Sequence, residues 1–529
     1  MLPREITTLV LGQNGEDALS SWTRRTFEAE VLPHFMPDRR WFADKASRPL
    51  AASISAAIRI EHADDRFAAV IADVDGLHGV SRYFLPLTIR WTRYTEIDHG
   101  PASVLAAVRR GPREGTLLDA TAEPEFITAL LAKIHAGETV GEGAQRLEFR
   151  PTGVFAASAL AKAETVKAIE GEQSNSSVIA DGKYVVKILR RITAGIHPEL
   201  EVGRFLADVA HFENAPTLYG SVELVEGENR SALAVVHKFI ENQGDAWTIT
   251  AAGLDRLVDE LRMLATDAIP ETVETASMLQ RMRQIGRRTA EMHQAFAGND
   301  ELPAFAPEPI TQHDTARWAD AGLSRARLVF AMLERGARDL SDAALQCAQR
   351  LLERRDEIEA YIEACRRLTL DAVKIRHHGD FHLGQVLIAK DDAYILDFEG
   401  EPRRSLEERR AKAPAARDVA GFLRSIDYAA SAAIEREPDL KPEDRDGVEL
   451  RLRGWVDQLS AAYWESYRET LGDSRLWPAD ADQIKALLDA FLLEKALYEI
   501  EYELSNRPAW AQIPLAATLR ILQQREGAA

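Results

Sequence analysis

The sequence contains very little cysteine, with Cys347 and Cys365 the two examples among 529 residues. So few cysteines in so long a chain do not make a disulfide framework, and they favour a reducing cytoplasm. No apolar run approaches the roughly 18 residues of a membrane-spanning helix. An acidic residue, Glu5, lies near the start of the chain, and the apolar run that follows it is short. This pattern is unlike a signal peptide. We therefore expect a cytoplasmic protein.

The chain also lacks an excess of positive charge. It has 65 basic and 84 acidic residues, for a formal net charge of -19. Such a field repels polyanions, so we expect no nucleic-acid partner and no anionic membrane partner. ATP is not excluded, because a few local cations and Mg²⁺ override a global field. The length predicts two or three domains or subdomains.

The order of predicted elements divides the chain into three parts. Residues 1–105 combine a helical pattern with alternating strands, and residues 106–241 contain a further helix and a second group of strands. Residues 242–529 are mainly amphipathic helices, interrupted by one β-rich island near 375–398. A small mixed lobe followed by a large helical lobe predicts an α+β, bilobal, protein-kinase-like fold, with a nucleotide between the lobes.

The most informative segment is HHGDFHLGQVLIAKDDAYILDFEGEP, residues 377–402. In protein kinases the catalytic loop reads H-R-D-x-x-x-x-N, and a hairpin then delivers D-F-G. Here His378, Gly379 and Asp380 are followed five positions later by Gln385, and Asp397 begins D-F-E after two apolar strands. A lone Asp in a loop is usually a turn or cap residue, but the conjunction of these features favours a catalytic loop.

Phosphoryl transfer explains these residue types. A sugar hydroxyl must be oriented and relieved of its proton, which a carboxylate at Asp380 can do. Mg²⁺ prefers hard oxygen ligands, and we predict that Asp397 and Gln385 supply them. Glu399 adds a second carboxylate near the metal, as a direct ligand or through water.

A phosphate-binding lysine is expected in the smaller lobe. SSVIA, the turn residues DG and KYVVKILRRI predict a hairpin. Lys187 lies in its apolar strand YVVKILRRI and matches the V-A-I-K lysine of kinases. A lysine flanked by apolar residues is costly to bury without a partner. Glu201, in the following helix, is the predicted partner and Glu199 is the alternative. The competing interpretation places Lys187 on the exposed face of an edge strand.

The glycine-rich phosphate loop of kinases, G-x-G-x-x-G, is missing. In its place Ser174, Asn175 and Ser176 precede a strand, and short polar side chains with backbone N–H groups can also bind phosphate oxygens. Taken alone, this run is typical of a turn. We also place Val236 and Lys238, on the strand SALAVVHKFIE, at the nucleotide site.

Several stretches together resemble the maltokinases, within the aminoglycoside-phosphotransferase-like kinases, and span essentially the whole chain. They are DRRWFADK, EQSNSSVI, VVKILRRI, HPELEVGRFL, GRRTAEMH, HHGDFHLGQ, ILDFEGEP, RDVAGFLRSIDYAA, EKALYEIEYE and NRPAWAQIPL. The resemblance implies ATP-dependent phosphorylation of maltose to α-maltose 1-phosphate for α-glucan synthesis. It also implies a cystatin-like N-terminal cap, an intermediate subdomain and a helical C-lobe. Many relatives are fused to trehalose synthase, so a synthase is an expected partner or fusion.

The acceptor site is expected in the helical part. On the helix FLLEKALYEIEYEL, Lys495, Tyr498, Glu499 and Tyr502 fall at i, i+3, i+4 and i+7 and share a face. Periodicity alone slightly favours ordinary packing, whereas the resemblance implies sugar binding by Tyr498 and Glu499.

Further predicted sugar contacts are Arg507, Trp510 and His382. We expect His293 to support packing or the catalytic loop, and Arg417 with Asp418 to brace that loop.

Two alternatives stay open from the sequence. One is a kinase for another sugar, such as glucosamine, or for an aminoglycoside, since an acidic stretch, EGEP, could meet an amine. The other is a non-catalytic module that binds maltose or tethers trehalose synthase. Pseudokinases usually lose the base, the metal-binding Asp or the Lys, and the three candidates are all present here.

Overall fold

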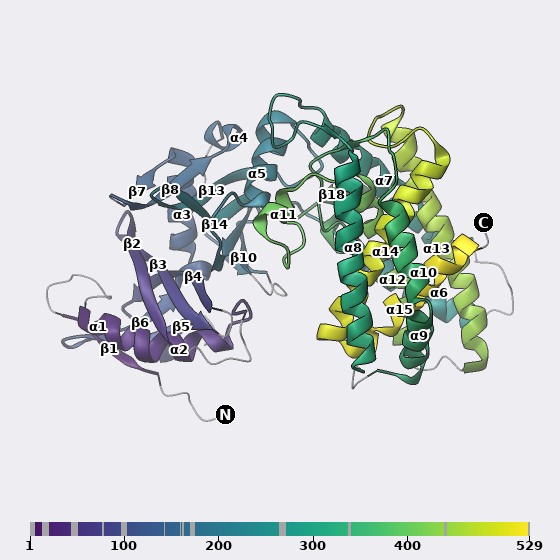
Figure 1. The fold of residues 1–529 in the computed structure, drawn as a ribbon. Helices are drawn as coiled ribbons and strands as arrows, with labels where there is room; N and C mark the ends of the chain where they lie inside the picture. The colour runs from purple at the N-terminus through teal and green to yellow at the C-terminus, as the bar shows by residue number, and fades with distance from the viewer. Residues whose placement is uncertain are drawn as a thin grey trace. The chain divides into compact units, whose positions relative to one another are not determined.

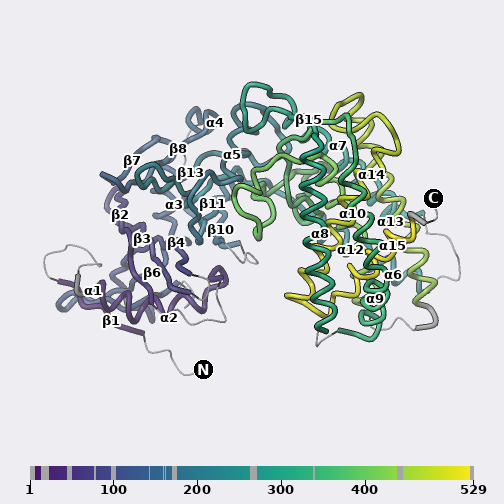
Figure 2. Tube along the Cα trace, viewed as in Figure 1, coloured from purple at the N-terminus to yellow at the C-terminus, as the bar shows by residue number. Residues whose placement is uncertain are grey.

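The computed structural model separates the chain into two compact units, Met1–Glu241 and Asn242–Ala529 (Figures 1 and 2). It describes residues 6–12, 21–43, 51–76, 79–96, 103–141, 143–158, 160, 163–169, 175–263, 271–336, 340–437 and 442–526. Across these ranges no helix combines the length and apolarity needed to cross a membrane. The mixture of sheets in the first unit and helices in the second confirms the predicted α+β fold class.

The first unit begins with a mostly antiparallel sheet in the order β1-β5-β6-β4-β3-β2, with β12 added beside β4. Its strands are β1 (Thr8–Val10), β2 (Ala52–His62), β3 (Asp65–Gly76), β4 (Gly79–Arg90), β5 (Val104–Arg110), β6 (Arg113–Asp119) and β12 (Arg191–Ile192). The sheet therefore continues past the predicted boundary at 105. The alanine-rich segment VLAAVRR has modest strand propensity, which explains why its pairing with β6 was hard to foresee.

Both faces of this sheet are apolar. One face packs against the segment α1 (Ser21–Thr26), η1 (Phe27–Val31) and α2 (Leu32–Phe35), in a core that contains Phe27, Leu32 and Tyr83. The other face contributes to a second core around α3 (Pro124–Ala136). A register shift in β2 between Ile54 and Ala56 moves the apolar side chains of that strand from the first face to the second.

A second sheet of seven antiparallel strands shares the core around α3. Its order is β7-β8-β13-β14-β11-β10-β9. The strands are β7 (Thr139–Val140), β8 (Gln145–Pro151), β9 (Val166–Ala168), β10 (Asn175–Ala180), β11 (Tyr184–Leu189), β13 (Leu218–Glu226) and β14 (Asn229–Lys238). The predicted hairpin is present: β10 and β11 pair across a turn whose central residues, Asp181 and Gly182, both have positive φ, as a tight hairpin requires.

Short helices complete this unit. They are α4 (Gly153–Ala156), α5 (Pro198–Arg204), the π-helical turn η5 (Phe205–Val209) and the 3₁₀ turns η2 (Met36–Asp38), η3 (Tyr94–Glu96) and η4 (Ala120–Ala122). The segment HPELEVGRFLADV, which carries Glu199 and Glu201, thus begins as α5 and ends as η5.

The second unit is built from long helices, with α7 along α13 and α12 between α6 and α14 (Figure 1). The helices are α6 (Ala246–Met263), α7 (Val273–Ala297), α8 (Gln312–Glu334), α9 (Asp342–Glu353), α10 (Arg355–Cys365), α11 (Leu406–Arg410), α12 (Ala416–Arg436), α13 (Pro442–Leu471), α14 (Ala481–Asn506) and α15 (Gln512–Glu526). Arg354 has non-helical dihedrals and separates α9 from α10.

Two small hairpins interrupt these helices. Strand β15 (Glu308–Pro309) pairs with β16 (Val373–Lys374), and β17 (Val386–Ala389) pairs with β18 (Asp392–Ile395). The second is the apolar hairpin expected after the catalytic loop. Its two turn residues, Lys390 and Asp391, both have positive φ.

Candidate active site

The lysine of the first unit is buried and paired. Lys187 lies on β11 and is 9% exposed, and its Nζ donates to Glu199 Oε2 at 3.1 Å. Glu199 is itself buried and its other oxygen lies 3.1 Å from His237 Nε2. The exposed edge-strand interpretation is therefore wrong. Glu199 also takes the position that we predicted for Glu201, because residues two apart on a helix point to nearly opposite faces.

Strand register decides which predicted nucleotide contacts share a face with Lys187. Its cross-strand neighbours are Ser177 on β10 and Val235 on β14, and directly opposed residues project to the same side of a sheet. Ser176 pairs with Ile188 and therefore projects to the opposite side, where it accepts a hydrogen bond from Arg190 Nε at 2.8 Å.

The other predicted contacts in this region separate in the same way. Val236 belongs to the hydrophobic core, on the side away from Lys187, while Lys238 is the exposed last residue of β14. Asn175 is the first residue of β10, and Ser174 lies outside the described residues. Ser177 stands in the same polar run and shares the face of Lys187, but it was not among the predicted contacts.

The catalytic loop of the second unit is held from beneath by Asp418 at the start of α12. Its two oxygens accept the backbone N–H groups of His378 at 2.8 Å and Gly379 at 2.9 Å. His293 Nε2 lies 3.1 Å from the same carboxylate, and its Nδ1 lies 2.9 Å from Tyr467 Oη. Burial would raise the pKa of Asp418, but His293 and nearby charges hold it well below its usual range. These contacts place Asp418 and His293 in the supporting roles expected for them.

Close packing against α12 also fixes the loop. A side-chain Cβ at Gly421 would lie 2.7 Å from the carbonyl oxygen of Phe381, a distance that Cβ atoms do not adopt. Only glycine lets the helix backbone approach the loop this closely. His378 Nε2 donates to the carbonyl oxygen of Leu396 at 2.7 Å, which ties the loop to the end of β18.

The predicted metal ligands lie at the base of the β17–β18 hairpin. Gln385 ends the 3₁₀ turn η6 (Leu383–Gln385), and its Nε2 lies 3.4 Å from Asp397 Oδ2. Asp397 has a φ of 58°, a left-handed conformation that is uncommon outside glycine. Asp392 anchors the hairpin to α7 through two hydrogen bonds from Arg288. Glu399 lies nearby in sequence, with Arg409 Nη1 at 3.8 Å from its Oε2.

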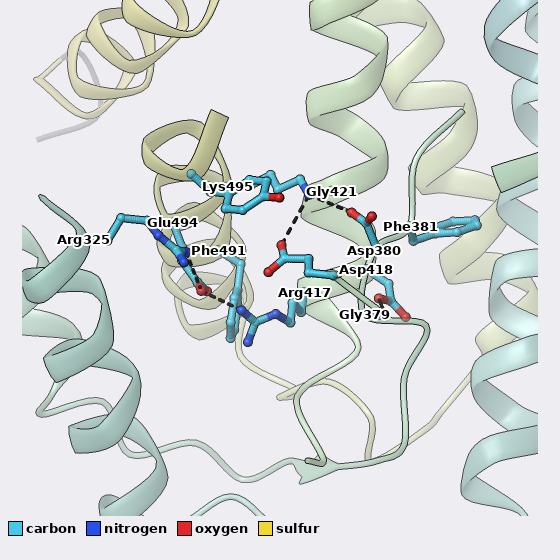
Figure 3. Close-up of a pocket in the computed structure, with 12 residues that line it drawn as sticks. Arg325, Gly379, Asp380, Phe381, Arg417, Asp418, Gly421, Phe491, Glu494 and Lys495 are labelled. Atoms are coloured by element: carbon cyan, nitrogen blue, oxygen red, sulfur yellow. Dashed lines mark hydrogen bonds and ion pairs between the residues drawn. The ribbon is translucent and has the colours of Figure 1, made fainter. Parts of the chain in front are cut away.

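Asp380 lines a pocket beside α14 (Figure 3). Lys495 Nζ donates to Asp380 Oδ1 at 3.1 Å and to Glu401 Oε1 at 3.5 Å. Burial would lower the pKa of Lys495, but Asp380 and Glu401 outweigh burial and raise it. Burial would likewise raise the pKa of Glu401, yet Lys495 and Arg404 lower it to about 2. The charged groups in the pocket are therefore already paired with one another.

A second cluster of charges lines the same pocket. Glu494 Oε1 accepts from Arg417 Nη2 at 2.6 Å and from Arg404 Nη2 at 3.2 Å, and Arg325 Nη1 lies 3.5 Å away. Arg325 also stacks over the ring of Tyr498, 5.2 Å from its centroid. Sequence analysis missed Glu494 and Arg325, because their roles depend on the packing of α8, α12 and α14 rather than on a motif, whereas Glu401 belongs to the acidic stretch EGEP.

The predicted sugar contacts fall into two groups. Lys495 and Tyr498 line the pocket with Asp380, whereas Glu499 is partly buried and accepts from Arg424 Nη2 at 2.6 Å. Arg507 binds Glu503 through two hydrogen bonds, at 2.6 and 3.0 Å, and its guanidinium lies 5.8 Å from the Trp510 ring centroid.

Glu499, Arg507, Trp510 and His382 are not among the residues that line the pocket. His382 Nδ1 accepts the N–H of Gly384 at 3.0 Å and caps η6. Tyr502 stacks on Tyr498 with ring centroids 6.4 Å apart. The sugar contacts predicted for Lys495, Tyr498, Glu499, Arg507, Trp510 and His382 stay predictions.

Comparison with known proteins identifies the class. The family described as the maltokinase N-terminal cap domain matches residues 35–122. A glucosamine kinase from Streptacidiphilus jiangxiensis is 28% identical over 382 residues, covering 71% of this chain and 78% of the relative. A glucosamine kinase from Mycolicibacterium smegmatis is 27% identical over 354 residues, covering 67% of this chain and 78% of the relative. The chain is a kinase-type phosphotransferase.

Solved structures support the same fold. A glucosamine kinase in complex with glucosamine, ADP and inorganic phosphate superposes with a TM-score of 0.61 at 22% identity, covering 93% of this chain and 99% of the other. A second crystal form of a glucosamine kinase gives a TM-score of 0.64 at 22% identity, with 94% and 99% coverage. The resemblance to maltokinases in their cap domain, the kinase-like fold and the prediction of a phosphotransferase are thereby confirmed.

Proposed function

We propose that this kinase transfers the γ-phosphoryl group of ATP to the anomeric hydroxyl of maltose, giving α-maltose 1-phosphate for α-glucan synthesis. The observation that carries the proposal is Asp380, whose carboxylate lines a pocket together with Lys495 and Tyr498. The maltokinase-type cap at residues 35–122 supports maltose as the acceptor.

The chain's own residues then have distinct tasks. Asp380 orients the acceptor hydroxyl and accepts its proton as the phosphoryl group arrives. Lys495 keeps a positive charge 3.1 Å from Asp380 Oδ1, which reduces the repulsion between that carboxylate and the incoming phosphate. Lys187, oriented by Glu199 at 3.1 Å, supplies the cation for the ATP phosphates.

The donor set at the hairpin suits Mg²⁺. Gln385 and Asp397 lie side by side, with an amide nitrogen 3.4 Å from a carboxylate oxygen, so turning the amide over, which exchanges its nitrogen and oxygen, presents two hard oxygens together. Asp397 and Gln385 would hold the ion, with Glu399 as a further carboxylate. When bound, Mg²⁺ neutralises charge on the phosphates.

Glucosamine is the second candidate acceptor. Two curated relatives that cover about two thirds or more of this chain are glucosamine kinases, and one solved structure with this fold contains glucosamine and ADP. Their identity to this chain is below 30%, and pocket side chains decide specificity more than fold does.

The test is ADP release measured with maltose, with glucosamine and without sugar. We expect turnover with maltose, a phosphate on the anomeric carbon of the product by phosphorus NMR, and dependence on Mg²⁺. Asp380→Asn should abolish turnover and leave ATP binding nearly intact, while Asp371→Asn, at an exposed side chain, serves as the matched control. Turnover by Asp380→Asn close to that of the control contradicts the proposed base.

A trehalose synthase is the proposed partner, either fused to the natural chain or bound to it. It rests on the maltokinase resemblance and the cap match. Co-purification of the kinase with a trehalose synthase encoded beside it tests the association. Independent elution of the two proteins at micromolar concentration speaks against a stable complex.

A further inference from the structure

The ammonium group of Lys495 occupies a site built for a cation. Its Nζ lies 3.1 Å from Asp380 Oδ1, 3.5 Å from Glu401 Oε1 and 4.7 Å from the ring centroid of Tyr498. Two carboxylates and an aromatic face are the groups with which proteins bind organic ammonium ions. Here the chain fills that position with its own side chain, as Figure 3 shows for Lys495 and Asp380.

The remaining carboxylates that line the pocket also have partners. Glu494 accepts from Arg417 and Arg404, and Glu401 accepts from Arg404 as well as from Lys495. Asp418, on the loop side of the pocket, accepts two backbone N–H groups. An acceptor that carried an ammonium group into this pocket would have to displace a protein cation to gain a counter-ion.

We propose that Lys495 is a specificity-determining residue that admits neutral sugars and rejects acceptors with an amine beside the reacting hydroxyl. This inference rests on the proposed function, because it assumes that the acceptor hydroxyl meets Asp380. In glucosamine the amine is on the carbon next to the anomeric carbon. Placing the anomeric hydroxyl at Asp380 therefore brings two positive charges together in a partly buried site, which disfavours binding.

The position of Lys495 makes it a fixed charge and not a mobile surface lysine. Its side chain is 18% exposed, that of Asp380 is 22% exposed and that of Glu401 is 5% exposed. It projects from α14, a helix of 26 residues that packs on α8 and α12. The adjacent carboxylates raise the pKa of Lys495 despite its burial, so the ammonium keeps its proton at neutral pH.

The experiment compares glucose with glucosamine, a matched pair that differs in one group, in the full chain and in Lys495→Met. Methionine keeps the length and apolar stem and removes the charge. We expect the wild-type chain to favour glucose in kcat/KM, and the ratio of glucosamine to glucose to rise at least tenfold in Lys495→Met. Lys495→Arg should keep the wild-type ratio. The ratio is informative even if total turnover falls, because both sugars share the same catalytic groups.

Three results would overturn the proposal: a wild-type preference for glucosamine, an unchanged ratio in a folded Lys495→Met, or an equal rise in Lys495→Arg. If the variant does not fold, the wild-type chain still provides a test. The KM for glucosamine should fall as pH rises through the pKa of the sugar's own amine, while the KM for glucose stays level, and parallel profiles contradict the inference.

Failure of the proposed function is recognised separately. It appears as absent turnover with maltose, glucose and glucosamine alike. Calorimetric binding of glucose and glucosamine to the wild-type chain and to Lys495→Met then decides the inference alone, and equal glucosamine affinity in both chains rejects it.

Discussion

The Arg190 guanidinium donates to Asp119 at 2.7 Å through the same nitrogen, Nη2, that lies 2.7 Å from Thr121 Oγ1. Its Nε donates to Ser176 on β10 at 2.8 Å, and its carbon centre lies 5.1 Å from the ring centroid of Trp41. Arg190 is 2% exposed. One buried side chain therefore joins the end of β6 in the first sheet to β10 in the second, at a residue of the polar run predicted to bind phosphate.

Replacing Arg190 should destabilise the first unit strongly. Arg190→Met leaves Asp119 buried without its charged partner, and breaking a buried pair in this way costs about 3–5 kcal/mol. Urea unfolding of the wild-type chain and the variant measures the loss. Arg191→Met, at the exposed neighbouring position, is the control and should change stability by less than about 0.5 kcal/mol. Equal stability of the two variants would contradict the buried link.

Glu199 and Glu201 provide a direct test of which carboxylate orients Lys187. Glu199→Gln removes a charged hydrogen bond at 3.1 Å, and losing about 1.5–3 kcal/mol corresponds to roughly a 10- to 150-fold fall in kcat/KM for ATP. Glu201→Gln should have a clearly smaller effect. Steady-state kinetics with varied ATP at saturating acceptor gives both values. The reverse order would restore our original prediction of Glu201.

Gly421 should matter for turnover more than for folding. Gly421→Ala places a Cβ 2.7 Å from the carbonyl oxygen of Phe381 and must displace the loop that carries Asp380. Since misplacing a reacting group by about 1 Å can cost about 100-fold, we expect kcat to fall by one to two orders of magnitude. Gly454→Ala is the control, because nothing lies within 4 Å of its added Cβ. A normal kcat in a folded Gly421→Ala chain would show that the loop tolerates the shift.

Asp392 should give the second unit a measurable acid sensitivity. Burial would raise its pKa, but Arg288 and Gln284 lower it to about 2 from 3.8. Because the pKa of Asp392 is lower in the folded chain than in the unfolded chain, its ionised carboxylate stabilises the fold. This contribution is fully present above the pKa of the unfolded chain and is lost as pH falls from about 4 towards 2. Because the side chain is 28% exposed, solvent screening limits the contribution to about 1–2 kcal/mol.

The corresponding measurement is the free energy of unfolding between pH 5 and pH 2, taken as about the range over which an Asp titrates. Asp392→Asn should lose this part of the pH dependence and be less stable at neutral pH. Asp391→Asn, at the adjacent turn residue, should keep the wild-type slope. Identical slopes in both variants would show that Asp392 does not titrate in this way.

Local patterns in the sequence were sufficient for much of the fold. The turns at Asp181–Gly182 and Lys390–Asp391 and the apolar strands beside them predicted two hairpins, because turn chemistry and side-chain alternation act within a few residues. The five-residue spacing from Asp380 to Gln385 and the position of Asp397 likewise come directly from the chain. These features need no long-range contact to be recognised.

Tertiary packing decided the rest. Whether Glu199 or Glu201 meets Lys187 depends on the rotation of α5 against the sheet, and a shift of two residues reverses the answer. The face of the sheet on which Ser176 and Val236 lie depends on strand register. A shift of the pairing by one residue moves every side chain of the strand to the other face. The pairing of Lys495 with Asp380 spans 115 residues and exists only because α14 packs beside the catalytic loop. Periodicity identifies the face of a helix, but only packing determines what that face meets.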